Sequence, residues 1–139
     1  MRKILAVFLC LFSVHLYADS SQLIFTNGWI KQLPPVIPMR AGYVNIENPT
    51  DKDIEITAMQ SDAFERVEMH ETLMQDGMMK MVQQDSFKIP AHSSIELKPG
   101  GKHIMLITPL NQLNIGDKVE LMVTFSDDKA QKIRLEVKQ

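Results

Sequence analysis

Histidine and methionine residues occur in this sequence at a spacing that can build a metal site. His103 and Met105 are two residues apart, and His70 and Met81 lie earlier in the chain. Residues i and i+2 of a β-strand point to the same face about 7 Å apart, so His103 and Met105 can converge on one ion. Ile104, between them, would face the opposite, packed side of the strand. The pattern therefore indicates a metal site on the outer face of a strand.

The types of these side chains favour monovalent copper. Thioether sulfur is a soft, neutral ligand that favours Cu(I) and has little to offer hard ions such as Mg²⁺ or Ca²⁺, and imidazole also binds copper. A site of two imidazoles and two thioethers carries no charge, so it does not over-compensate a monovalent ion. Thioethers need no deprotonation, so only the histidines make binding depend on pH. We therefore expect Cu(I) as the bound ion.

The overall composition is that of one globular domain. The chain has 139 residues, of which 45% are hydrophobic and 23% charged, and its formal net charge is −2. This length suits one domain and leaves little room for a second. The basic residues are scattered and do not form the stripe that nucleic-acid binding requires. We therefore expect no nucleic-acid partner.

Several kinds of active site are excluded by the residues that the chain lacks. The single cysteine, Cys10, falls in an N-terminal apolar segment, so the domain that follows has no disulfide, thiolate ligand or thiol nucleophile. No serine or threonine stands in a nucleophile elbow. A catalytic zinc site built from the two histidines and Glu68 or Glu71 would leave the methionines without a role. A blue-copper electron-transfer site needs a cysteine ligand. We expect the protein not to be an enzyme.

The N-terminus has the pattern of a signal peptide. A short basic region precedes the apolar run 4–11, and residues 16–18 supply a cleavage site. The run is too short to span a bilayer, which takes about 20 residues. The residues before Cys10 lack the small side chains expected next to a lipid-acceptor cysteine. We therefore expect residues 1–18 to be a signal peptide, residues 19–139 to form the domain, and the product to be periplasmic with no stable membrane insertion after cleavage.

Short alternations of apolar and polar residues predict an all-β domain. Ile54, Ile56 and Ala58 alternate with polar residues, so one face of their strand is buried and the other is wet. Residues 78–83 form another candidate strand, and Gln75-Asp76-Gly77 before it predicts a hairpin turn. No segment keeps a helical period over ten or more residues. About seven or eight short strands of this kind indicate a two-sheet sandwich with Greek-key connections.

Three stretches that carry these residues resemble the PCuAC family of periplasmic copper chaperones. The stretches are 67–72, 77–81 and 99–106. The motif of that family is a histidine, ten residues, a methionine, twenty-one residues and then His-x-Met. Here ten residues separate His70 from Met81, and twenty-one separate Met81 from His103-Ile104-Met105. The resemblance extends over the domain, from Trp29 to the closing strands.

The resemblance implies a fold, a ligand set and a function. The fold is a cupredoxin-like Greek-key β-sandwich, and the bound ion is one Cu(I). The ligands that the resemblance implies are His70, Met81, His103 and Met105. It also implies delivery of the copper to the assembly of respiratory cytochrome oxidase. The partner would be a copper-accepting oxidase subunit or a thiol-containing assembly factor.

A protein-docking module without a metal role is the competing interpretation. In that case the domain is an exported β-sandwich, and its methionines form an adaptable hydrophobic surface. For His103 and Met105 taken alone, a surface histidine beside a core methionine is the more common situation. The match of all four residues to one motif favours the metal site instead.

The remaining histidines, methionines and acidic residues receive simpler predictions. Met69 faces away from His70 and is predicted to pack in the core. The other methionines predicted to pack are Met39, Met59 and Met122. Those on or near the hairpin, which could help copper enter or leave, are Met74, Met78 and Met79. His92 is predicted to be exposed in a loop. The acidic side chains predicted to form a solvated rim or a docking patch are Glu68, Glu71 and Asp76.

Overall fold

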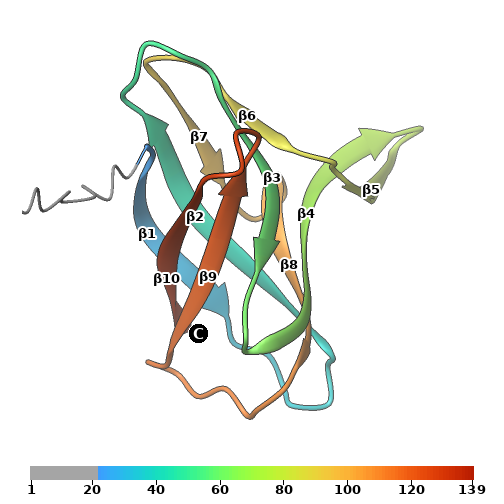
Figure 1. Ribbon diagram of the computed structural model, residues 1–139. Coiled ribbons are helices and arrows are strands. Elements are labelled where there is room, and N and C mark those ends of the chain that lie inside the picture. Colours follow the sequence, from blue (N-terminus) through green and yellow to red (C-terminus); the bar gives the residue numbers. More distant parts are fainter. Residues whose placement is uncertain (1–21) are drawn as a thin grey trace, which may run out of the picture.

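Ten β-strands and no helix make up residues 22–139, which are the residues that the computed structural model describes (Figure 1). The strands are β1 (Ile24–Lys31), β2 (Met39–Asn48), β3 (Ile54–Gln60), β4 (Phe64–Gln75), β5 (Met78–Gln83), β6 (Phe87–Ile89), β7 (Ser93–Leu97), β8 (Lys102–Pro109), β9 (Lys118–Phe125) and β10 (Ala130–Lys138). Within this part of the chain, no helix is long and apolar enough to cross a membrane. The predicted signal peptide, residues 1–18, lies outside the described residues. The expected all-β class is confirmed.

The strands follow one hydrogen-bonded path that folds into two layers. Their order is β5-β4-β8-β2-β1-β10-β9-β3-β6, and β7 pairs with β2. β1 and β10 run parallel, whereas β2 pairs antiparallel with β8 through residues 39–42 and with β7 through residues 44–48. The path curves round until β3 lies beside β4 (Figure 1). This arrangement places β4 and β8, which carry the candidate histidines, next to each other.

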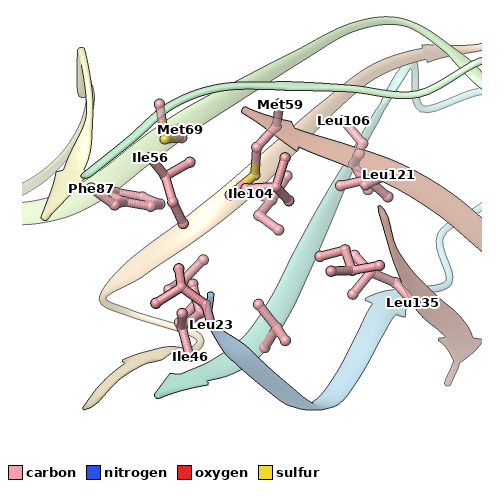
Figure 2. Close-up of a cluster of buried hydrophobic side chains, with 14 of the residues drawn as sticks. Leu23, Ile46, Ile56, Met59, Met69, Phe87, Ile104, Leu106, Leu121 and Leu135 are labelled. Carbon is pink, nitrogen blue, oxygen red and sulfur yellow. The ribbon is translucent and has the colours of Figure 1, made fainter. Parts of the chain in front are cut away.

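A core of aliphatic side chains holds the two layers together. Alternate residues of each strand point inward, as the period of a half-buried strand requires. Ile104 and Leu106 of β8 are fully buried, and Met69 of β4 and Met59 of β3 pack with them (Figure 2). The inward predictions for Ile104, Met59 and Met69 are confirmed. The residues between them on β4 and β8 therefore face outward.

β4 and β5 form a hairpin that projects from the body of the sandwich (Figure 1). Asp76 and Gly77 join the two strands, and both have positive φ, 52° and 75°. Two such residues define the two-residue turn whose twist matches that of antiparallel strands. The predicted hairpin turn is therefore confirmed. Every residue of β5 is exposed.

Strand β1 lacks the period-2 pattern by which strands are recognised, and the position of Met39 differs from the sequence-based expectation. The sequence of β1 does not alternate, because a bulge at Asn27 and Gly28 shifts its register against β2. Asn27 takes the left-handed conformation, with φ 54°. A bulge of this kind adds a residue to one strand and interrupts the period-2 pattern. Met39, at the start of β2, is exposed and does not pack in the core.

Candidate metal centre

His70 and His103 lie directly opposite each other on the outer face of β4 and β8. The register of these antiparallel strands pairs the two residues, and their ring centroids are 5.8 Å apart at an interplanar angle of 42°. His103 is only 3% exposed, although it points away from the core. The side chain of His70 is 15% exposed. The structure therefore brings two candidate ligands together at a partly covered position.

Tyr43 and Trp29 border this pair on the side of β2 and β1. Gly42 pairs with Ile104, so the register places Tyr43 next to His103 on the same face. The ring of Tyr43 packs on that of Trp29, with centroids 4.7 Å apart. Burial raises the pKa of Tyr43 above its ordinary value. By this register, Tyr43 and His70 flank His103 on the outer face.

A hydrogen bond fixes the tautomer of His103. Its Nδ1 lies 3.0 Å from the carbonyl oxygen of Gly101. Because a carbonyl oxygen only accepts, Nδ1 carries the proton and donates it. In the neutral ring Nε2 then carries a lone pair, and a ring nitrogen with a lone pair can bind a metal ion.

Glu68 fixes the tautomer of His70 in the same manner. Nε2 of His70 lies 2.8 Å from Oε2 of Glu68, and the other carboxylate oxygen lies 3.3 Å from Nε of Arg66. An ionised carboxylate can only accept a hydrogen bond, so Nε2 is the donor. The lone pair of His70 is therefore on Nδ1. Histidines that bind metals are commonly oriented by a carboxylate or a carbonyl oxygen on their other nitrogen.

Both lone-pair nitrogens are buried and have no hydrogen-bond partner among residues 22–139. They are Nδ1 of His70 and Nε2 of His103. A buried polar atom without a partner costs about 1–3 kcal/mol. This cost is avoided if both nitrogens bind the same metal ion. The pair fits a metal ion that binds imidazole, such as copper or zinc, and the methionine sulfurs on the same face favour a soft ion.

Met105 and Met81 lie on the same face, on either side of the histidine pair. Met105 of β8 is half-buried and lies opposite Glu68, whereas Met81 of β5 lies opposite Thr72 and is 63% exposed. With ordinary strand spacings, a flat sheet would place the Cα atoms of the two methionines about 17 Å apart. The structure thus groups His70, His103 and Met105 and leaves Met81 on the projecting hairpin. Curling of the hairpin over the face would be needed to bring the fourth residue in.

Acidic residues do not assemble a competing metal site. Among residues 22–139, no group of three or more His, Cys, Asp or Glu side chains is placed to hold a metal ion. Glu71, considered above as a zinc ligand, lies on the opposite face from His70, and its Oε1 accepts a hydrogen bond of 3.0 Å from Lys102. A metal bound at the histidine pair must therefore be completed by other donors, of which the methionine sulfurs are the neighbours on that face.

The role of Glu68 was missed by the sequence analysis, which assigned it to a solvated rim. The spacing Glu68-x-His70 is the signal that could have found it, because i and i+2 share a face of a strand. His92 is exposed, as predicted, and its ring pairs with Asp51 at 2.6 Å in a loop contact. It takes no part in the centre.

The chain belongs to the LpqE-like family: the sequence profile described as "Putative lipoprotein LpqE-like" matches residues 23–138. A Rickettsia prowazekii protein named "Uncharacterized protein RP573" is 36% identical over 94 residues, which cover 67% of this chain and 51% of the relative. The chain thus spans about half the length of that curated relative.

Solved structures with the same fold include PCuAC domains. The "Copper-bound PCuAC domain from PmoF2" has a TM-score of 0.71 at 18% identity and covers 84% of this chain and 92% of its own. The "Solution structure of CuI-DR1885 from Deinococcus Radiodurans" has a TM-score of 0.63 at 24% identity and covers 81% of this chain and 75% of its own. At these identities the likeness shows the fold. The expected cupredoxin-like fold, and the resemblance to PCuAC domains at the level of fold, are confirmed.

Proposed function

We propose that this protein is an exported copper chaperone that binds one Cu(I) ion. The proposed ligands are His70, Met81, His103 and Met105. The observation that carries the proposal is the pair of buried, unpartnered nitrogens on facing histidine rings, each with its tautomer set by a hydrogen bond on the opposite nitrogen. Such nitrogens are prepared to donate lone pairs without losing a proton.

Methionine sulfur makes Cu(I) the ion that suits this centre. The two imidazoles and two thioethers are neutral, and soft sulfur donors favour Cu(I) over Zn²⁺ or hard ions. Similar domains have been described as copper-bound and as the Cu(I) form, which supports the choice of ion. Because Cu(I) is cargo here, weak and exchangeable ligands are an advantage. Met81 is the most exposed of the four, so a partner's thiolate or imidazole would displace it first.

X-ray absorption at the copper edge tests the ligand set. The protein loaded anaerobically with one Cu(I) should show two nitrogen and two sulfur scatterers. Replacing Met81 by Leu should remove one sulfur and weaken Cu(I) binding while the fold is retained. Met78→Leu is the matched control, because Met78 is equally exposed but lies on the other face of the same strand. If Met81→Leu binds Cu(I) as tightly as the unaltered protein, the four-ligand assignment is wrong.

Export is the second part of the proposal. The N-terminal pattern supports a cleaved signal peptide, with residues 19–139 as the periplasmic domain, and the family description as lipoproteins fits an exported protein. The mass of the protein isolated from the periplasm tests the processing. Cleavage after Ala18 should give a chain that begins at Asp19 without an added lipid. A lipid-modified chain that begins at Cys10 would show that the predicted cleavage site is wrong.

Delivery to cytochrome oxidase is the third part, and it follows from the resemblance to copper chaperones. The proposed acceptor is a copper-binding oxidase subunit or a thiol-containing assembly factor. A strain that lacks the gene should lose cytochrome oxidase activity under copper limitation. The unaltered gene should restore this activity, and a His70→Ala/His103→Ala gene should not. Restoration by the double variant would contradict a copper-delivery role. No catalytic step is part of the proposal.

A protein-docking role is the second candidate, and the exposed apolar hairpin favours it. Large apolar side chains of β4 and β5 that lie in solvent are Leu73, Met74, Met78, Met79, Met81 and Val82. Exposed apolar groups of this kind often mark interaction sites. Metal stoichiometry separates the two functions, because a docking module would bind no Cu(I) at the histidine pair.

A further inference from the structure

The hairpin methionines are sorted by the strand register onto two faces. Met74 of β4 lies directly opposite Met79 of β5, and Met81 follows two residues later on the same strand. Paired residues of an antiparallel ladder and residues i and i+2 share a face. Met74, Met79 and Met81 therefore form one cluster on the face that carries His70. Met78, opposite Gln75, points to the other face.

The three sulfur atoms of this cluster are within reach of one ion. Directly opposite residues have Cβ atoms about 4.5–5.5 Å apart, and diagonal neighbours lie about 7–8 Å apart. Methionine has three rotatable bonds and a polarisable sulfur, so small adjustments bring the sulfurs together. Met74 and Met79 are 72% and 64% exposed. Packing against the core therefore does not explain why methionines occupy these positions.

We propose that Met74, Met79 and Met81 form a second binding site for a soft monovalent ion. Cu(I) is the physiological candidate of this class, and Ag(I) is its redox-inert counterpart. Three neutral thioethers favour a soft ion of low charge and bind no hard cation well. The site is weaker than the histidine centre, because it has no imidazole donor.

Met81 is common to this thioether site and to the proposed histidine centre. An ion on the hairpin can keep its bond to Met81 while the bonds to Met74 and Met79 are replaced by bonds to His70 and His103. The copper remains Cu(I) throughout, and the step exchanges two thioether bonds for two imidazole bonds. The cluster is thus an entry site on the path to the centre. This second step rests on the proposed function, whereas the thioether site itself does not.

Titration with Ag(I), followed by NMR of ¹³C-labelled methionine methyl groups, tests the inference. The unaltered protein should bind one ion tightly and, because Met81 is shared, a second ion only weakly through Met74 and Met79. The His70→Ala/His103→Ala variant should bind one ion at Met74, Met79 and Met81. In that variant the methyl signals of Met74, Met79 and Met81 should shift. A further Met79→Leu substitution should abolish the binding, while Met78→Leu, the neighbouring residue on the other face, should not change it.

Other results would overturn either the inference or the proposed function, and the two failures differ. If the folded His70→Ala/His103→Ala variant binds no Ag(I), or if Met78→Leu removes binding as fully as Met79→Leu, the thioether site is wrong. If a Met74→Leu/Met79→Leu variant binds nothing while the histidine double variant keeps one ion, the histidine centre is wrong and the thioether site stands. Methyl signals of core residues such as Met69 report whether each variant is folded.

Discussion

Removing the carboxylate of Glu68 should weaken Cu(I) binding without removing any proposed ligand. Glu68 accepts the proton of His70 Nε2 at 2.8 Å, and the two side chains are 20% and 15% exposed. The hydrogen bond holds the ring with Nδ1 buried and without a partner among residues 22–139. In Glu68→Ala the ring can rotate or change tautomer, and part of the binding energy is spent on restoring its orientation. Loss of such an orienting partner typically costs about 10–100-fold in metal affinity.

The expected loss corresponds to about 1.4–2.8 kcal/mol of binding free energy. Loss of the contact between Glu68 and Arg66 adds little, because Arg66 is well exposed and surface ion pairs contribute about 0–1 kcal/mol. Glu68→Gln keeps an oxygen that can accept from Nε2, so it should lose less affinity than Glu68→Ala. This order of the two variants distinguishes orientation of the ring from a general effect of negative charge.

An anaerobic competition titration against a chromophoric Cu(I) chelator measures the effect. Glu71→Ala is the matched control, since Glu71 is next to His70 in sequence but pairs with Lys102 on the opposite face. Its Cu(I) affinity should stay within about threefold of the unaltered protein, because it orients no ligand. Equal losses for Glu68→Ala and Glu71→Ala would refute the orienting role of Glu68. So would an unchanged affinity of Glu68→Ala.

Three further substitutions test the framework around the centre. Ile104→Ala, at a fully buried position of β8, should lower the free energy of unfolding by about 2–5 kcal/mol in urea denaturation, whereas Ile115→Ala at an exposed position should change it by less than about 0.5 kcal/mol. Asn48→Ala should lower the free energy of unfolding by about 2–4 kcal/mol in the same assay, because the buried amide of Asn48 donates to the carbonyl oxygens of Lys52 and Ile89. A loss below about 1 kcal/mol would show that water replaces these hydrogen bonds. Gly77→Ala should destabilise the hairpin by about 1–2 kcal/mol, because Gly77 has φ 75° and alanine is strained in that conformation. The effect should appear as faster amide hydrogen exchange in β5, and Gly77→Asn should lose less stability than Gly77→Ala. Equal exchange rates in all three proteins would contradict this role of the positive φ.

Local features of the fold were predictable from the sequence. The period-2 pattern of β8 put Ile104 in the core and His103 on the outer face, and Asp76-Gly77 predicted the turn between β4 and β5. Both depend on neighbouring residues alone, so they can be read without knowing the tertiary structure. The same applies to Met69, which alternates with His70 and is buried.

Features that depend on how distant strands pair were not predictable in the same way. The residues around His70 do not predict that it lies opposite His103, because this pairing depends on the register of β4 against β8. The position of Tyr43 next to His103 depends on a third strand, β2. The bulge at Asn27 hid β1, since it breaks the alternation by which strands are recognised. Met39 is exposed because it lies on the outer face of β2, opposite Ile107.

The spacing of the residues along the sequence was enough to propose the four ligands, but it could not predict how close they lie in space. His70, His103 and Met105 meet on two paired strands, whereas Met81 lies across β4 on the hairpin. Spacing along a sequence does not state how far a hairpin bends. We expect the copper-loaded protein to show two sulfur scatterers by X-ray absorption, which would mean that Met81 reaches the histidine pair.

The central claim is that Nδ1 of His70 and Nε2 of His103 bind Cu(I), and copper stoichiometry tests it most directly. The purified protein is titrated anaerobically against a chromophoric Cu(I) chelator, together with a His70→Ala/His103→Ala variant whose fold is checked by NMR. We expect one tightly held Cu(I) in the unaltered protein, and the loss of that ion in the folded double variant. Equally tight binding in both proteins would contradict the claim, because the ion would then be bound by other residues. No competition with the chelator by either folded protein would contradict it too and would favour the protein-docking role.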